Sequence, residues 1–120
     1  MAKVSGLKLP KGMSPRAVRE FRRIRPELVA RGVCEIDLPA LLAYLQHWAM
    51  WEEAREKLEE LGTVVVTSQG QMQINPWHSV MKQNSELMKK WVQELGFSPG
   101  SRKRLGLVLE ERLTDEDLVT

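Results

Sequence analysis

Four arginines near the start of the chain have the spacing of one helix face: Arg16, Arg19, Arg22 and Arg23. The planar guanidinium group offers paired hydrogen-bond donors that match the oxygens of a phosphate group. We expect no acidic residue on this face, whereas a solvated face usually mixes Glu with Arg. The spacing therefore predicts phosphate contacts, which position a nucleic acid but do not read its sequence. The alternative is a solvated helix face without a ligand.

Charge is segregated along the chain, although the net charge is only +2. Residues 1–31 carry nine Lys or Arg against two Glu, and residues 70–104 carry six against two. Residues 32–69 and 105–120 are acidic. Separate basic blocks indicate a polyanion-binding surface at particular places, and merely solvated faces are the alternative. The second block ends in further candidate DNA-binding residues: Arg102, Lys103 and Arg104.

Residues for catalysis or metal binding do not cluster in this sequence. His47 and His78 lie far apart, only Cys34 could join them, and no metal-ligand spacing is present. The segment 96–103 lacks the residue order of a phosphate-binding loop, and Pro99 removes a backbone donor that such a loop needs. We therefore expect no catalytic residue, no metal site and no cofactor, and we interpret the chain as not an enzyme.

The length and composition favour one domain in the cytoplasm. A chain of 120 residues matches a single domain. A lone cysteine cannot form an intrachain disulfide, and no apolar run approaches the ~20 residues that span a bilayer. We expect a flexible basic arm over residues 1–13, one helical domain over 14–106 and an acidic tail over 107–120.

Helix caps followed by proline predict a mainly α fold. We expect a short basic helix from Pro15 to about Arg25, where Pro26 interrupts it, and a further turn that ends at Gly32. Two long helices, over 37–61 and 75–95, should form an antiparallel hairpin. The β-branched segment 63–67 and the segment 71–74 predict a small β-hairpin between them. A short fourth helix should span 98–105.

The apolar faces of these helices predict their packing. In the first helix, Ala17, Phe21, Ile24 and Leu28 share one face. The third helix has one stripe: Trp77, Val80, Met81, Leu87, Met88, Trp91, Val92 and Leu95. Asn84 interrupts this stripe. We expect a core amide with a local partner there, and the alternative is a polar residue that sets the helix register.

The second helix is too long and too apolar for a small monomer. Its length would be about 36 Å at 1.5 Å per residue, whereas the radius of gyration of a compact chain this long is about 14 Å. Its apolar arc is broader than one partner helix needs. We therefore predict a neighbouring subunit, and the alternative is that the first helix covers the surplus. The expected interface residues are Leu45, Trp48, Trp51 and Leu58.

Several short motifs occur in a distinctive order over residues 14–106. They are Phe21 with Pro26-Glu27-Leu28, the link 32–37, Tyr44, the segment 48–54, Leu61-Gly62, Gly70, Asn75-Pro76, and Leu95-Gly96-Phe97-Ser98-Pro99 with Ser101-Arg102. With these motifs the sequence resembles the phage terminase small subunits, which are DNA-packaging proteins of tailed phages. The sequence lacks a convincing helix-turn-helix signature, so the resemblance does not indicate which helix reads DNA.

The resemblance implies a function in the host bacterial cytoplasm. Such subunits bind double-stranded phage DNA for packaging and assemble into rings, and they recruit or regulate the large subunit, which carries the ATPase and nuclease. The acidic tail is then either a solubilising segment or a docking segment for the large subunit. The alternatives to this function are a phage or bacterial regulator that binds DNA as a dimer and a structural adaptor without a DNA role.

Overall fold

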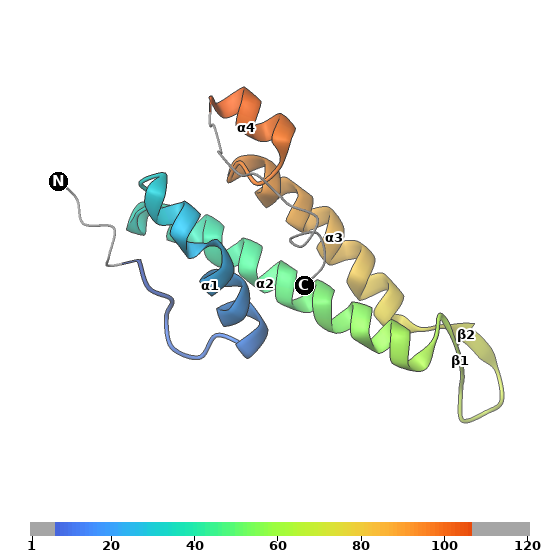
Figure 1. Cartoon of the computed structure of the whole chain (residues 1–120). Helices are drawn as coiled ribbons and strands as arrows, with labels where there is room; N and C mark the ends of the chain where they lie inside the picture. The colour runs from blue at the N-terminus through green and yellow to red at the C-terminus, as the bar shows by residue number, and fades with distance from the viewer. Residues whose placement is uncertain (1–6, 107–120) are drawn as a thin grey trace, which may run out of the picture.

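The computed structural model describes residues 7–106 and shows a mainly helical protein (Figure 1). Its elements are α1 (Pro15–Ala30), the 3-10 helix η2 (Glu35–Asp37), α2 (Leu38–Leu61), β1 (Val64–Val66), β2 (Met72–Ile74), α3 (Pro76–Glu94) and α4 (Pro99–Leu105). α2 and α3 form a long hairpin. α1 packs on α2 at one end of this hairpin, α4 follows α3 at the same end, and the β1–β2 sheet lies at the other end (Figure 1). The mainly α class and the small sheet are confirmed.

The helices begin where caps and prolines predict. The side chain of Ser14 accepts a hydrogen bond from the Ala17 amide, and that of Asn75 accepts one from the Trp77 amide. Ser98 and Ser101 form a reciprocal capping box at the start of α4. These side chains satisfy backbone donors that the first turn leaves without partners. The local sequence alone therefore sets three of the four helix starts.

The predicted interruption at Pro26 is wrong, because α1 is continuous from Pro15 to Ala30 with Pro26 inside it. Proline removes one helical hydrogen bond and crowds the preceding turn, which costs about 3 kcal/mol. Ile24 and Leu28, on either side of Pro26, are both buried in the same core. This packing keeps both halves of α1 in one continuous helix. The helix then ends before Gly32, whose φ of +78° suits glycine.

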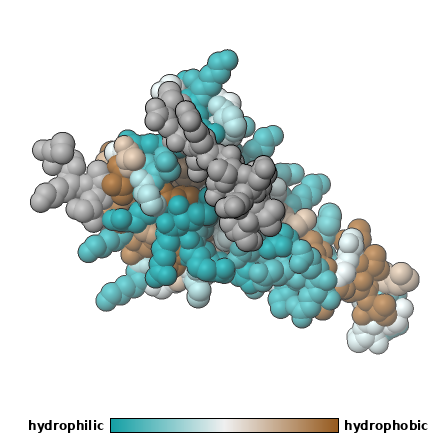
Figure 2. Space-filling model, viewed as in Figure 1, coloured by the Kyte–Doolittle hydropathy of each residue, from teal (hydrophilic) through white to brown (hydrophobic). Residues whose placement is uncertain are grey.

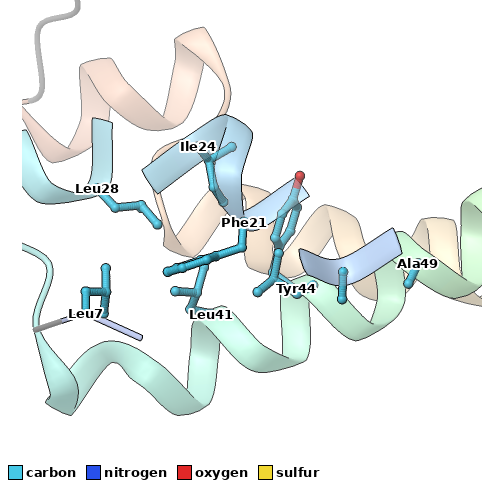
Figure 3. Close-up of a cluster of buried hydrophobic side chains, with 9 residues drawn as sticks. Leu7, Phe21, Ile24, Leu28, Leu41, Tyr44 and Ala49 are labelled. Atoms are coloured by element: carbon cyan, nitrogen blue, oxygen red, sulfur yellow. The ribbon is translucent and has the colours of Figure 1, made fainter. Parts of the chain in front are cut away.

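The core lies between α1 and the first half of α2 (Figure 3). The whole predicted apolar face of α1 is buried there. Leu41, Tyr44, Leu45 and Ala49 supply the α2 side. Thus α1 does cover part of the apolar arc of α2, as the alternative reading of that arc proposed. Leu7, which precedes α1 by eight residues, is also buried in this core.

The stripe on α3 is only partly covered. Met88, Trp91, Val92 and Leu95 pack as half-buried side chains against the core. Leu87, another member of the stripe, is exposed, and no residue of α3 is fully buried. α3 packs mainly against α2 along one side, and α4 contacts it near its C-terminal end (Figure 1).

Asn84 lies between the two long helices. Its amide nitrogen donates to the carbonyl oxygen of Val80 over 2.8 Å, which is the predicted local partner. Its amide oxygen lies 3.0 Å from Nδ1 of His47 on α2. That oxygen only accepts hydrogen bonds, so a hydrogen bond here requires the His47 tautomer with its proton on Nδ1. Through its contact with His47, Asn84 therefore also links α3 to α2.

The β1–β2 sheet has an apolar face that the described residues leave uncovered. In its antiparallel register, Val64 pairs with Ile74 and Val66 pairs with Met72. Directly paired residues point to the same side of a sheet, and so do alternate residues of a strand. These four side chains therefore share one face, and all are exposed. Figure 2 shows hydrophobic residues gathered at this end of the molecule.

Candidate nucleic-acid interface

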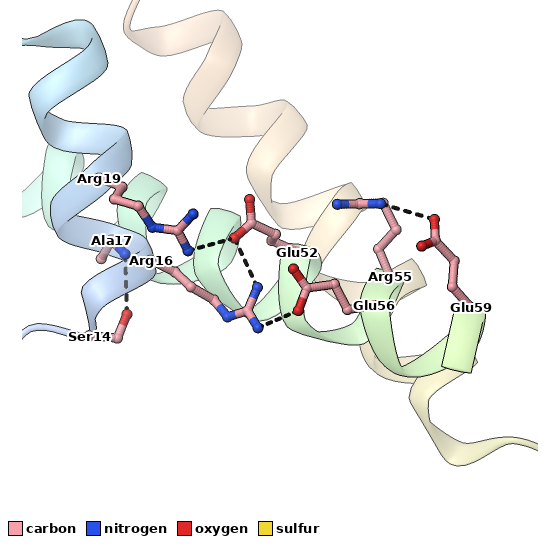
Figure 4. A network of polar contacts seen from close by, with 8 residues as sticks. All are labelled: Ser14, Arg16, Ala17, Arg19, Glu52, Arg55, Glu56 and Glu59. Atoms are coloured by element: carbon pink, nitrogen blue, oxygen red, sulfur yellow. Dashed lines mark hydrogen bonds and ion pairs between the residues drawn. The ribbon is translucent and has the colours of Figure 1, made fainter. Parts of the chain in front are cut away.

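Two of the four predicted arginines on α1 tie this helix to α2 (Figure 4). Arg16 donates through Nη1 to Glu52 over 2.9 Å and through Nη2 to Glu56 over 2.5 Å. Arg19 donates to the same oxygen of Glu52 over 3.3 Å. The hydrogen bond from Arg16 holds the pKa of Glu56 below its usual value. Arg16 is therefore engaged within the chain, whereas the side chain of Arg19 remains 63% exposed.

Arg23 belongs to a buried polar cluster. It donates to both carboxylate oxygens of Glu20, over 2.6 and 2.8 Å. The hydroxyl group of Tyr44 donates to Glu20 from α2 over 2.5 Å. Burial raises the pKa of Tyr44, and the hydrogen bond to Glu20 raises it further. These bonds satisfy the buried carboxylate, while the side chain of Arg23 stays 69% exposed.

The structure thus brings acidic residues to the arginine face, contrary to the expectation that none would be there. Glu20 comes from α1 itself, and its spacing of three residues from Arg23 was visible in the sequence. Glu52 and Glu56 come from α2, and no local pattern shows which α2 carboxylates will face α1. Fewer arginines are therefore unpaired and available for phosphate contacts than the four that the sequence predicted.

Residues 7–13 extend the basic surface of α1. The Nε atom of Arg25 donates to the Leu7 carbonyl oxygen over 3.2 Å, and the Leu7 side chain is 3% exposed. Between this segment and α1 lies an open groove of about 430 Å³. Lys8, Lys11, Arg22 and Arg25 line it, and no Asp or Glu of the described chain does. The sequence predicted a flexible arm over 1–13, but it did not predict that part of this arm lies against α1.

Arg22 is the one predicted arginine on α1 with no hydrogen bond or ion pair to the part of the chain that the structure describes. It lies one helical turn from Arg19 and also borders the groove. Arg22 therefore joins the exposed cations of α1 to those of the segment before it. We call these cations, together with the half-buried Arg25, the arm–helix surface: Lys8, Lys11, Arg19, Arg22, Arg23 and Arg25.

The second predicted basic patch occupies the last turn of α4. Arg102, Lys103 and Arg104 lie there, where cations interact favourably with the helix dipole. Arg104 also donates to the Gln93 carbonyl oxygen over 3.0 Å. Part of this charge therefore stabilises α4 and its junction with α3. The side chain of Lys103 is exposed.

Side-chain contacts connect the end of α1 to the segment that leads into α4. Arg31 at the end of α1 donates to the Leu95 carbonyl oxygen over 2.9 Å, and its guanidinium lies 5.9 Å from the centre of the Phe97 ring. Phe97 packs edge-on against Tyr44, with ring centres 5.0 Å apart. α4 therefore starts beside the end of α1.

The predicted oligomer-interface residues have unequal access to a partner. Leu45 is completely buried within the chain, which leaves it no surface for another subunit. Trp48 packs against the edge of the core. Trp51 and Leu58 are half-buried, and the Arg55 guanidinium lies 5.9 Å from the Trp51 ring centre. Leu61, one turn beyond Leu58, is exposed beside the apolar sheet face.

Within residues 7–106, no group of three or more His, Cys, Asp or Glu side chains could hold a metal ion. In the same range, no helix is both long enough and apolar enough to cross a membrane.

Comparison with known proteins gives one match. A family model described as "Phage terminase, small subunit" matches residues 17–112. This range includes most of α1 with Arg19, Arg22 and Arg23, and all of the α2–α3 hairpin, the β1–β2 sheet and α4; Arg16 lies just before it. No curated protein and no solved structure matches the chain significantly.

Proposed function

This chain belongs to the phage terminase small-subunit family, and from that premise we propose that it binds double-stranded phage DNA for packaging. Terminase small subunits are generally non-catalytic. In this proposal the chain acts in the host bacterial cytoplasm, where it assembles with further copies of itself and recruits or regulates the large ATPase and nuclease subunit.

The arm–helix surface is the observation that supports DNA binding most strongly. It gathers exposed cations from two chain segments around a groove that no described acidic residue lines. Arg19, Arg22 and Arg23 would contact phosphates, together with Lys8 and Lys11. Arg16 would act indirectly, because it holds α1 on α2 through Glu52 and Glu56. Such contacts would fix the position of DNA without reading its bases.

The patch on α4 would add a second set of contacts from Arg102, Lys103 and Arg104. It lies at the same end of the hairpin as α1 (Figure 1). In an assembly, both surfaces would be repeated around the complex. Many weak phosphate contacts then give a high overall affinity, because each further contact becomes intramolecular.

We place the contact between subunits on the uncovered apolar surface. It comprises the β1–β2 face, Leu61, Leu58 and Trp51. An isolated two-stranded sheet is marginal in water, so a covering partner would stabilise it. The hairpin also presents its half-buried α3 stripe to a neighbour. A ring of subunits would cover these surfaces.

DNA binding is tested by titrating the full-length protein against a fluorescent duplex at several salt concentrations. The expected result is an association constant that falls linearly with salt on logarithmic axes, because bound cations release counterions. Absence of salt-sensitive binding to duplex DNA would contradict the proposal.

Light scattering on the same samples tests assembly. A mass several times that of the 13.8 kDa chain is expected. A discrete dimer that protects a short palindrome would favour a DNA-binding regulator instead.

A further inference from the structure

The groove of the arm–helix surface combines positive charge with an apolar floor. Four cations line it, and Leu9, Val18 and Phe21 contribute apolar surface between them. A bare phosphate backbone would use only the cations. A groove of this composition fits a peptide that carries both carboxylates and aliphatic side chains, since each class of group then has a partner.

The C-terminal segment 107–120 has that composition. It contains five acidic residues and one arginine, together with six Leu or Val residues: Leu107, Val108, Leu109, Leu113, Leu118 and Val119. Two consecutive acidic residues follow Leu109, and three lie directly before Leu118. Carboxylates and aliphatic groups therefore alternate in short clusters along the segment.

The segment is also long enough to reach the groove of its own chain. Fourteen extended residues span about 46 Å. The segment follows α4, whose start is held beside the end of α1 by the bond from Arg31 to Leu95. Along α1, Arg22 precedes Arg31 by nine residues, or about 14 Å, and α4 adds about 10 Å. The extended length of the segment exceeds both shorter dimensions of the molecule, which are 36 and 26 Å.

We propose that the acidic segment 107–120 docks in the groove between residues 7–13 and α1 of the same chain. Its carboxylates meet Lys8, Lys11 and Arg22, and its aliphatic side chains lie on the groove floor. The docked segment then covers part of the DNA-contacting surface and is displaced when DNA binds. The competition with DNA rests on the proposed function, whereas the docking itself does not.

Crosslinking tests the docking without DNA. Full-length protein is treated with a carbodiimide, which joins amines to carboxylates in direct contact, and the products are identified by mass spectrometry. Crosslinks from Lys8 or Lys11 to Asp115, Glu116 or Asp117 are expected. Their absence overturns the proposal.

The same experiment separates docking within one chain from docking between chains. Assemblies are formed from equal amounts of 14N- and 15N-labelled protein. Crosslinked peptides of uniform label are expected. Pairs that join a light half to a heavy half would assign the segment to a neighbouring subunit and overturn docking within the chain.

A matched pair of full-length variants tests the consequence for DNA. The tail variant carries Asp115→Asn, Glu116→Gln and Asp117→Asn, and the control carries Glu59→Gln, Glu60→Gln and Glu86→Gln at exposed sites on α2 and α3. Both lose three negative charges. If the segment occupies the groove about nine-tenths of the time, the tail variant should bind duplex about tenfold more tightly than the control. Hydrogen exchange at residues 7–13 should also be faster in the tail variant alone.

Equal DNA affinities and equal exchange rates in the two variants would overturn the proposal. If no variant binds DNA while the crosslinks and the exchange difference are present, docking stands and the proposed function fails. If every protein binds DNA equally and the crosslinks are absent, docking fails and the proposed function stands.

Discussion

The arginines of α1 differ in what their guanidinium groups contact, and this difference decides what each substitution should do. Arg16 reaches two carboxylates of α2, Arg23 reaches a buried carboxylate of its own helix, and Arg22 is exposed at the groove. Their common helix face was predictable from spacing alone. Their partners were not, because Glu52 and Glu56 approach α1 only through the packing of two separate helices.

The contact between Arg16 and Glu56 predicts that the stability of the fold depends on pH in the acidic range. The bond to Arg16 lowers the pKa of Glu56 from its usual 4.5, so the folded state favours the ionised carboxylate. This contribution is present above pH 4.5 and is lost as the pH falls through the lowered pKa. The melting temperature of Arg16→Ala, followed by circular dichroism, should therefore fall less steeply below this pH than that of the wild type.

Arg22→Ala is the control for the acid experiment, because Arg22 has no ion pair with the described residues. Its acid dependence should equal that of the wild type. Identical acid profiles for the wild type and Arg16→Ala would show that the contact with Glu56 does not contribute to stability.

The cluster of Tyr44, Glu20 and Arg23 predicts a second effect on stability. Tyr44→Phe keeps the ring but leaves the buried Glu20 with one donor fewer. The free energy of unfolding should fall by about 1–2 kcal/mol, measured by urea denaturation. An unchanged urea midpoint would contradict a stabilising role for this hydrogen bond.

Alkaline pH provides an independent check on Tyr44. Its pKa is raised in the folded state, so its contribution to stability is complete below pH 10 and is lost only as the pH rises further. The wild type should lose this contribution in alkali, whereas Tyr44→Phe has no such contribution to lose.

At the scale of the elements, the sequence predicted the helices better than their packing. Helix starts depend on neighbouring residues such as Ser14-Pro15 and Asn75-Pro76, and these predictions are confirmed. The break at Pro26 was wrong, because burial of Ile24 and Leu28 outweighs a local cost. The exposure of Leu87 could not be predicted, because an apolar stripe does not show how much of it a neighbouring element will cover.

The exposed face of the β1–β2 sheet carries a prediction about assembly. Val66→Thr with Met72→Thr places a β-branched side chain at both strand positions but removes apolar surface from this face. Because we place the contact between subunits there, the mass from light scattering should fall toward 13.8 kDa. The helical signal in circular dichroism should not change.

Gln73→Thr is the matched control for the sheet. Gln73 follows Met72 on β2, and its side chain points to the opposite face of the sheet. It should leave the mass unchanged. If the double variant also keeps the wild-type mass, the subunit contact lies elsewhere, for example on the uncovered stripe of α3.

At the scale of the whole molecule, the chain is elongated, and its two ends differ in chemical character. Its radius of gyration is 17.5 Å, against about 14 Å for a compact chain of this length. The arm–helix surface lies at one end, and the apolar sheet face lies at the other (Figures 1 and 2). The 24 residues of α2 account for the long axis, and the separation of charged and apolar ends depends on how α1 folds back. In our account, DNA binding and assembly therefore use different ends of the chain.

The most direct test of DNA binding by the arm–helix surface is the salt dependence of duplex affinity in two paired variants. Lys11→Ala with Arg22→Ala removes two cations from this surface, and Lys82→Ala with Lys89→Ala removes two exposed cations from α3. The first variant should bind more weakly than the wild type, with a logarithmic salt slope smaller by about 2, because two phosphate contacts are lost. The second should keep the wild-type slope. An unchanged slope in the first variant, or an equal loss in both, would contradict the account.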